Sequence, residues 1–541
     1  MTHCRIIIKT INANLLIACL AMLALQGCIN QQPNNTLAID SDWYTNGAAA
    51  VEKASNRPYN NSPGAAKNII LFIGDGMGVS TVSAARIFAG QQLGQSGEEY
   101  VLSFETFPWT GLVKTYNTDA QVPDSAGTAT AIMSGVKTRS GVIGIDGRPE
   151  RGSCESYLNT EGASVISALE LAEIAGKATG VISTATITHA TPASAYAHVA
   201  DRNWETSRSL PNEAKQNGCT DIAQQLVDME ARLEAKVNNS VDHPDIDGLD
   251  LAFGGGRGMF FGEDPVSLTG FAEGPGEGRR DDGQNLIATW QSRGGRYIMD
   301  QAGFDNLDTD ETSNVLGLFQ TSHMRYEADR HNDEAGEPSL TEMTLKAIEL
   351  LQQDNDGFFL MVESGRVDHA HHVNNAYNAL NDAAELSRAV DATLAAVDLN
   401  DTLIIVTADH SHVMTFAGYP ARNNPILGIA GQDSNGNPYT TLNYANGAGF
   451  DDNGSNTDAN TRSGPPAPGR HDLTGVDTTA PGYHQESLVG TFAETHGGED
   501  VGVYAIGPGG HLLSGVIEQN VIFHVMNFAG DLSNKAVRAL E

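Results

Sequence analysis

Three apolar runs of strand length each lead to an acidic residue, and this pattern constrains the fold more than any other feature of the 541-residue sequence. The runs and their acids are residues 68–73 with Asp75, 358–362 with Glu363, and 402–407 with Asp409. Apolar runs without polar alternation are typical of parallel strands that are buried on both faces. Because the carboxyl ends of parallel strands meet at one edge of a sheet, where open α/β folds build their sites, these acids should converge there.

Further segments extend this pattern along the chain. Residues 180–183 and 502–506 also have strand character, and helical patterns cover 163–175 and 376–397. Strands that alternate with helices predict an α/β fold with a large central, mostly parallel sheet flanked by helices. Residues 67–541 are expected to form the catalytic domain.

One region departs from the pattern. Residues 423–484 are dense in Gly, Asn, Asp and Pro. This composition predicts a long, loop-rich surface insertion, a crown on the domain, rather than sheet.

The N-terminus has the pattern of an export signal. Arg5 and Lys9 precede an apolar run over residues 11–25, which is shorter than the ~20 residues of a membrane span. Residues 1–27 are therefore expected to be a signal peptide. Leu25-Gln26-Gly27-Cys28 resembles the bacterial lipobox, which predicts acylation of Cys28, with plain cleavage as the alternative.

The segment after this signal has the composition of a tether. Residues 28–66 are rich in Asn, Gln, Pro and Ser. We expect an exported protein in the periplasm, or a lipoprotein at the outer membrane or cell surface.

The chain is strongly acidic. It carries 32 Lys and Arg against 67 Asp and Glu, a formal net charge of −35. Such a surface repels nucleic acids and anionic lipids, so we expect no nucleic-acid binding and contact with a membrane only through a lipid anchor. An anionic substrate would need strong local positive charge.

Two of the five cysteines remain once Cys4, Cys19 and Cys28 are assigned to the N-terminal signal and its cleavage site. These are Cys154 and Cys219. In an oxidising compartment they favour one disulfide. A metal pair is the alternative, although neither has another His or Cys at ligand spacing.

Two short segments have residue types that are typical of a binding or catalytic site: a glycine-rich turn and a serine at the start of a helix. Gly74-Asp75-Gly76-Met77-Gly78 follows the first strand, but its glycines do not match the G-x-G-x-x-G pattern of dinucleotide binding, and a tight turn is the alternative. Ser125, after Pro123 and Asp124, precedes small residues compatible with a helix. A serine at a helix N-terminus can act on phosphate, or Asp124 or Ser125 can simply cap the helix. No G-x-S-x-G motif surrounds it.

Histidines accompany the acids near three of these segments. In a helix, Asp368 and His372 would lie at i and i+4 and could share a metal ion. His410 and His412 follow Asp409, and His496 lies in Glu494-Thr495-His496. Mixed carboxylate and imidazole ligands suit Zn²⁺, and oxygen ligands suit Mg²⁺. Two metal ions beside a serine predict phosphoryl transfer.

Together these motifs resemble the alkaline phosphatase family over most of residues 67–530, and the animal form more than the enterobacterial form. The matching segments are 74–78, 123–126, 188–193 with Arg202, 362–369, 407–412 and 495–500. The resemblance implies hydrolysis of phosphate monoesters through a phosphoserine on Ser125, and a homodimer. The alternatives are a phosphodiesterase or sulfatase of the same fold, or an exported lipoprotein that binds metal or phosphate without turnover.

The resemblance also implies a set of site residues, with Arg202 as the clamp on phosphate. The ligands it implies are Asp368, His372 and His496 for one Zn²⁺, Asp75, Ser125, Asp409 and His410 for a second, and Asp75, Thr191 and Glu363 for Mg²⁺. Four further side chains would contact these groups without binding a metal ion themselves: those of Asp124, His189, His369 and His412. His484 is a loop histidine and the rival of His496 as a ligand.

Two further features follow from the resemblance. The family disulfide matches Cys154 and Cys219. The Ca²⁺ site of the animal enzymes is not carried over in full, because Gln320 stands where the family has a glutamate, although an acid falls at Glu337.

Overall fold

The computed structural model describes residues 63–237, 246–263, 277–308 and 314–540. The expected signal peptide over residues 1–27, Cys28 and most of the tether lie outside these residues, so their roles stay predictions. The chain divides into two units, Met1–Pro58 and Tyr59–Glu541, and every described element belongs to the second. None of the described helices combines the length and apolarity needed to cross a bilayer.

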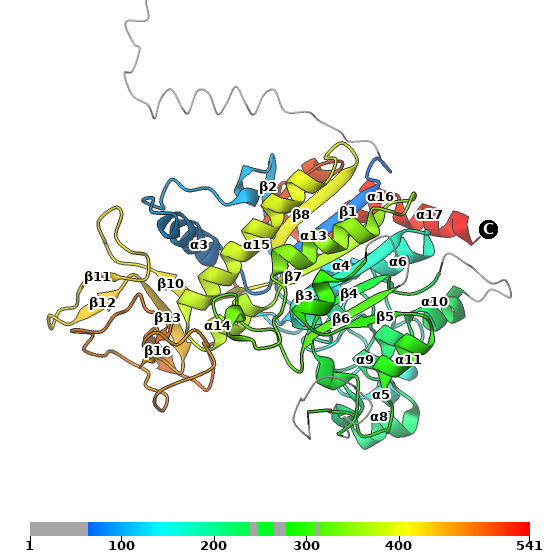
Figure 1. Cartoon of the computed structure of the whole chain (residues 1–541), viewed down its shortest axis with the longest axis horizontal. Coiled ribbons are helices and arrows are strands. Elements are labelled where there is room, and N and C mark those ends of the chain that lie inside the picture. Colours follow the sequence, from blue (N-terminus) through cyan, green and yellow to red (C-terminus); the bar gives the residue numbers. More distant parts are fainter. Residues whose placement is uncertain (1–62, 238–245, 264–276, 309–313, 541) are drawn as a thin grey trace, which may run out of the picture. The chain divides into compact units, whose positions relative to one another are not determined.

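A ten-stranded sheet runs through the described part of the domain, in the order β19-β2-β18-β8-β1-β7-β3-β4-β6-β5 (Figure 1). Its strands are β1 (Asn68–Gly74), β2 (Trp109–Lys114), β3 (Ala178–Thr186), β4 (Leu251–Gly255), β5 (Arg296–Ile298), β6 (Val315–Gln320), β7 (Phe358–Ser364), β8 (Thr402–Ala408), β18 (Val501–Ile506) and β19 (Gly515–Glu518). Only β18 runs antiparallel to its neighbours within this sheet. The expected large and mostly parallel sheet is therefore confirmed.

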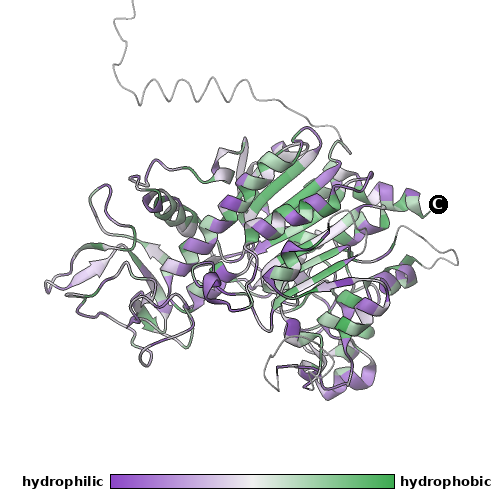
Figure 2. Ribbon diagram, viewed as in Figure 1, coloured by the Kyte–Doolittle hydropathy of each residue, from purple (hydrophilic) through white to green (hydrophobic). Residues whose placement is uncertain are grey.

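The register of the central strands brings the acids together. Gly74 of β1 lies opposite Ser364 of β7 on one side and Ala408 of β8 on the other. Asp75 and Asp409 therefore stand at one level on the carboxyl edge of the sheet, and Glu363, which lies opposite Ile73, is one register position before Gly74 on the same edge. The three strands are buried over almost their whole length, and Figure 2 shows the strongly apolar centre of the sheet.

Helices cover both faces of the sheet. One layer contains α3 (Val79–Gln92), α13 (Leu340–Leu351) and α15 (Ala376–Ala396), which pack on one another, and Figure 1 shows α13 and α15 crossing the central strands. The other contains α4 (Ser125–Ser134), α6 (Ala168–Ile174), α16 (Val521–Gly530) and α17 (Leu532–Ala539). The other α-helices of the described residues are α5 (Cys154–Leu158), α7 (Ala190–Ala193), α8 (Asn212–Asn217), α9 (Ile222–Val227), α10 (Met229–Val237), α11 (Leu286–Ser292), α12 (Gln301–Asp305) and α14 (Arg366–His372).

The helix expected over residues 163–175 begins later than its apolar pattern suggested. The Ser167 hydroxyl accepts a hydrogen bond from the Glu170 N–H, and the Glu170 side chain accepts one from the Ser167 N–H. This capping box starts α6 at Ala168.

The insertion over residues 423–484 was expected to lack sheet, and this expectation is wrong in part. It contains β11 (Ile429–Gln432), β12 (Pro438–Thr440), β13 (Leu442–Gly447) and β14 (Asp451–Asp452), and it reaches β15 (Tyr483–His484). Some of the Asn, Asp and Gly residues that suggested loop form turns between these short strands, whereas Asp451 and Asp452 form β14 itself. Between β11 and β12, for example, the Asp433 carboxylate accepts hydrogen bonds from the N–H groups of Asn435 and Asn437.

The insertion also pairs with strands outside it. β13 lies between β10 (Met414–Phe416) and β16 (Ser487–Gly490). β17 (His496–Gly497) pairs with β9 (Ser411–His412), so His496 lies opposite His412. The segments before and after the insertion are thus joined at the carboxyl edge of the sheet.

Candidate active site

The site is built on the turn that follows β1. Gly76 has a φ of +70°, and a Cβ at this position would lie 2.3 Å from the ring of His412. The Gly76 N–H donates a hydrogen bond of 3.0 Å to Oδ1 of Asp409. Only glycine fits this turn without displacing its neighbours, because an L side chain is strained at positive φ.

Ser125 is the first residue of α4 and is buried. Asp124 caps the helix by accepting a hydrogen bond from the Gly127 N–H, so Ser125 is free for another role. The Ser125 Oγ lies 3.1 Å from Nε2 of His410 and 3.5 Å from Oδ1 of Asp75. The serine therefore stands among the predicted ligands, at the helix N-terminus where an anion is favoured.

The first cluster of candidate ligands gathers around Asp368. Its Oδ1 lies 3.3 Å from Nε2 of His372, 3.4 Å from Nε2 of His496 and 2.8 Å from Nε2 of His412. Although burial opposes ionisation, the charges and hydrogen bonds of these imidazoles bring the pKa of Asp368 well below its usual value. One acid and three imidazoles form a donor set that suits Zn²⁺.

The second cluster joins Asp75, Asp368 and His410. Nε2 of His410 lies 3.3 Å from Oδ1 of Asp75 and 3.4 Å from Oδ2 of Asp409. Asp409 is thus close to this group, as expected, and Asp368 lies between the first two clusters.

The third cluster joins Asp75, His189 and Glu363, whose ligand atoms lie within 4.8 Å of one another. Oδ2 of Asp75, Oε1 of Glu363 and Oγ1 of Thr191 are all buried without a hydrogen-bond partner among the described residues. Burial, reinforced by neighbouring carboxylates, raises the pKa of Asp75 well above its usual value and that of Glu363 to about 8. Crowded buried carboxylates with orphaned oxygens are the donor set that a hard cation such as Mg²⁺ would satisfy, so the residues fit a metal ion.

Arg202 lies beside these clusters, held by two partners. One of its terminal nitrogens donates to Oδ2 of Asp124 at 3.2 Å, and the other lies 3.1 Å from Nε2 of His189. Burial disfavours the Asp124 anion, but the Arg202 charge and N–H groups of Gly141 and Gly127 bring the pKa of Asp124 below its usual value. The guanidinium supplies the local positive charge that an anionic substrate requires in this acidic chain.

A layer of histidines lies behind Arg202. The ring of His189 is 5.4 Å from that of His369 and 5.7 Å from that of His323. Nδ1 of His369 accepts a hydrogen bond from Arg366 at 2.8 Å. His369 was expected here, whereas His323 was missed because it is a single histidine with no motif around it.

His412 was expected behind the ligands; the structure places it within the first cluster, with its two nitrogens facing two carboxylates. Nδ1 is 2.5 Å from Oε2 of Glu494, and Nε2 faces Asp368. Burial disfavours the charged ring, but these two carboxylates raise the pKa of His412 to about 10. Glu494 was noticed only as part of the His496 motif, and its buried position was not foreseen.

His484 lies apart from these clusters. Its nitrogens face the carbonyl oxygens of Gly482 and Ala459, inside the insertion. His496, not His484, is therefore the histidine that reaches the candidate site.

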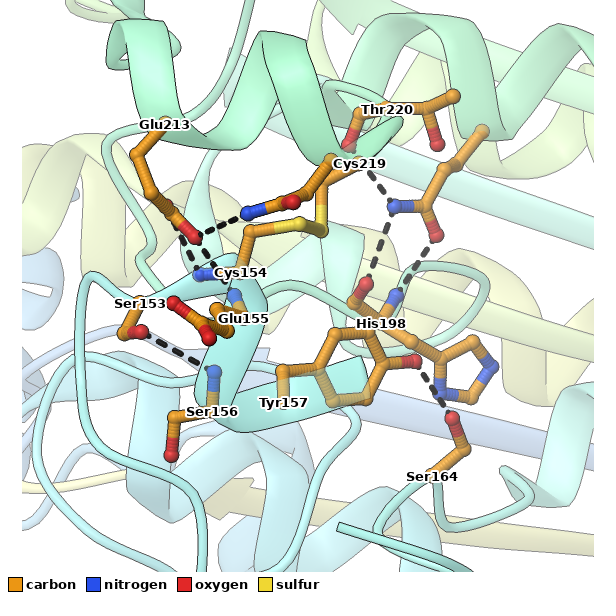
Figure 3. The surroundings of a disulfide bond; sticks show 12 residues. Ser153, Cys154, Glu155, Ser156, Tyr157, Ser164, His198, Glu213, Cys219 and Thr220 are labelled. Atoms are coloured by element: carbon orange, nitrogen blue, oxygen red, sulfur yellow. Dashed lines mark hydrogen bonds between the residues drawn. A yellow bond between two sulfur atoms is a disulfide. The ribbon is translucent and has the colours of Figure 1, made fainter. Parts of the chain in front are cut away.

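The expected disulfide between Cys154 and Cys219 is present, with Cα atoms 6.1 Å apart, and it joins the start of α5 to the residues after α8 (Figure 3). Glu213 of α8 braces the same junction, because its carboxylate accepts hydrogen bonds from the N–H groups of Cys154 and Glu155.

The fold and the site together define a class of protein: an α/β enzyme whose sheet edge carries a buried serine, an arginine and clusters of carboxylates and imidazoles suited to metal ions. The family model "Alkaline phosphatase" matches residues 66–532. The chain is 42% identical over 471 residues to the tissue-nonspecific isozyme of alkaline phosphatase from Homo sapiens, covering 86% of this chain and 83% of that protein. It is 40% identical over 471 residues to alkaline phosphatase from Gadus morhua, covering 86% and 91%.

Solved structures agree in fold. The alkaline phosphatase of Thermus thermophilus superposes with a TM-score of 0.59 at 23% identity, covering 93% of this chain and 99% of that chain. The enzyme from the Antarctic bacterium TAB5 gives 0.55 at 23% identity, covering 88% and 99%.

The chain belongs to the alkaline phosphatase family, and it is therefore a metal-dependent enzyme that hydrolyses phosphate monoesters. Its similarity to curated animal enzymes confirms the resemblance to the animal form.

Proposed function

We propose that the enzyme hydrolyses phosphate monoesters through a covalent phosphoserine on Ser125, with two Zn²⁺ and one Mg²⁺ as cofactors. The observation that carries this proposal is the buried Ser125 hydroxyl, at the N-terminus of α4 and within 3.5 Å of both His410 and Asp75. Asp124 already caps this helix. Ser125 is therefore not needed as a cap, and its hydroxyl lies among the candidate ligands.

The proposed ligands follow the three clusters. Asp368, His372 and His496 would hold one Zn²⁺; Asp75, Asp409, His410 and Ser125 the other; and Asp75, Thr191 and Glu363 the Mg²⁺. When bound, such ions lower the pKa of a coordinated hydroxyl and stabilise negative charge on the transferring phosphoryl group. Ca²⁺ is left out because Gln320 is neutral.

Two side chains of the protein, Arg202 and Ser125, then have separate roles in the reaction. Arg202 binds two phosphate oxygens in a bidentate manner, with Asp124 and His189 fixing the guanidinium. The Ser125 Oγ loses its proton and attacks phosphorus as the bond to the alcohol oxygen breaks, and the departing alcohol takes up a proton. Water then attacks the phosphoserine, the bond between phosphorus and Oγ breaks, and phosphate leaves while Ser125 regains its proton.

The cellular setting is part of the proposal. The sequence pattern of residues 1–28 supports export and lipidation at Cys28, with residues 28–66 as a tether to the periplasmic or outer surface of a membrane. Similarity to the family supports a homodimer.

The test compares the wild-type chain from Cys28 onward with Ser125→Ala and Ser125→Thr, each supplied with Zn²⁺ and Mg²⁺, on p-nitrophenyl phosphate at alkaline pH. Wild type should hydrolyse the ester rapidly and lose activity after chelation. When the substrate carries ³²P and the reaction is quenched in acid, wild type should retain the label covalently. Ser125→Ala should lose the labelled enzyme while keeping its metal content.

The Ser125→Thr variant is the matched control, because it keeps a hydroxyl and should keep part of the labelling. Full turnover by Ser125→Ala would refute the nucleophile. Turnover of bis(p-nitrophenyl) phosphate in preference to the monoester would favour the phosphodiesterase alternative.

A further inference from the structure

Glu494 is a buried acid that the proposed mechanism leaves without a role. It is 1% exposed and lies two residues before His496. Three chain segments meet at it: α14 with His372, the segment with His412, and β17 with His496. Each carries an imidazole of the cluster around Asp368.

The backbone of Glu494 holds His372 from two sides. Its N–H donates to the His372 carbonyl at 2.9 Å, and its carbonyl lies 2.6 Å from Nδ1 of His372. Because a carbonyl only accepts, Nδ1 must carry the proton, and in the neutral ring this leaves Nε2 with the lone pair that a metal ion needs. The tautomer of this candidate ligand is thus fixed by residue 494.

The side chain of Glu494 holds the neighbouring segment. Its Oε2 lies 2.5 Å from Nδ1 of His412, and its Oε1 accepts a hydrogen bond of 2.7 Å from the Val413 N–H. Nε2 of His412 in turn contacts Oδ1 of Asp368 at 2.8 Å. A continuous path of hydrogen bonds therefore runs from Glu494 through one imidazole to the acid of the cluster.

The arrangement suits a carboxylate better than an amide of the same size. Each carboxylate oxygen faces its own donor, one on Val413 and one on His412. An amide has one oxygen and one NH₂ group, so a glutamine that keeps the hydrogen bond from the Val413 N–H turns its NH₂ group toward Nδ1 of His412. His412 would then have to accept at Nδ1, and the hydrogen bond from its ring to a carboxylate would be replaced by a weaker one from a neutral amide, so the ring would be held less firmly.

We propose that Glu494 is a positioning residue: its backbone orients His372, and its carboxylate orients His412 and through it Asp368, which sets the zinc affinity of the cluster formed by Asp368, His372 and His496. This inference rests on the proposed zinc centre. Glu494 binds neither metal nor substrate, and acts only through the two histidines. Hydrogen-bond partners behind metal ligands typically contribute 10–100-fold to metal affinity.

The experiment measures zinc affinity of the chain from Cys28 onward by competition with a chelator of known affinity, with metal content counted by mass spectrometry. Glu494→Gln should bind the more weakly held zinc about 10–100-fold less tightly than wild type. Its turnover should recover as free zinc is raised, because the ligands themselves remain.

The matched control is Glu213→Gln. Glu213 is also a glutamate whose two oxygens face separate N–H donors, those of Cys154 and Glu155, but it lies at the disulfide. This variant should keep wild-type zinc affinity. A purely structural role of Glu494 would instead lower the melting temperature of the zinc-free protein without changing the zinc dependence of turnover.

Glu494→Asp serves as the second variant if Glu494→Gln does not fold. It keeps two acceptors but withdraws them by one methylene, and should give intermediate zinc affinity. Wild-type zinc affinity in either folded variant would overturn the inference. If the wild-type chain itself binds no zinc, the proposed centre fails and this inference fails with it, which metal counting on wild type distinguishes.

Discussion

Opening the disulfide should destabilise the domain by a calculable amount. Cys154 and Cys219 are 65 residues apart in sequence. In the chain-entropy model, closing a loop of this length in the unfolded chain contributes about 4 kcal/mol to stability. Unfolding entropy is about 2.1 cal/mol/K per residue, so for the unit Tyr59–Glu541 the melting temperature should fall by about 4 °C.

The assay is differential scanning calorimetry at one scan rate on Cys154→Ala, Cys219→Ala and the double variant. Either single substitution opens the loop, so all three should lose nearly the same amount, with differences of about 1 °C from the removed sulfur atoms. If the melting temperature of the double variant fell by the sum of the two single decreases, the reasoning would be refuted. Such additivity would show that the loss comes from local packing rather than from loop closure. An unchanged melting temperature would refute it as well.

Three further changes probe the site. Arg202→Lys should raise the inhibition constant of inorganic phosphate about 10–100-fold, because an ammonium cannot make the paired charged hydrogen bonds of a guanidinium. An unchanged constant would show that Arg202 does not bind phosphate in this way. Gly76→Ala should lower stability by about 1–3 kcal/mol and weaken metal retention, because its Cβ would meet the His412 ring at positive φ; a wild-type melting curve and metal content would contradict this. In metal-free protein, burial raises the pKa of Glu363 to about 8 from 4.5, so the folded state holds a proton that the unfolded chain releases between these values. Stability should therefore fall as pH rises from about 5 to 8, and Glu363→Gln, which cannot ionise, should flatten that slope in calorimetry across this range.

The sequence predicted the structure best where a chemically distinctive residue follows a buried strand or lies at a helical spacing from another. The strands before Asp75, Glu363 and Asp409 were predictable because each is a continuous apolar run, and parallel pairing then required their ends to meet. Asp368 and His372 were predictable because helical spacing places them one turn apart. The disulfide was predictable because two cysteines remained in a chain whose N-terminus has the sequence pattern of an export signal.

Other elements left weaker signals. β4 ends in two glycines, and the strands of the insertion are only two to six residues long, so neither shows a clear period. The antiparallel direction of β18 depends on pairing with β8 and β2, which no local pattern records. His323 and Glu494 owe their positions to long-range packing, and no spacing rule could reveal them.

The scattered origin of the site residues has a consequence for how the protein matures. Nδ1 of His496 is held by the carbonyl of Pro123, a residue 373 positions earlier in the chain. This contact can therefore form only after the chain has been made as far as residue 496 of 541. A chain truncated before β17 could form the early strands, yet it would lack this closing histidine. Cofactor acquisition should accordingly be a late event in biogenesis, acting as a checkpoint on completed molecules.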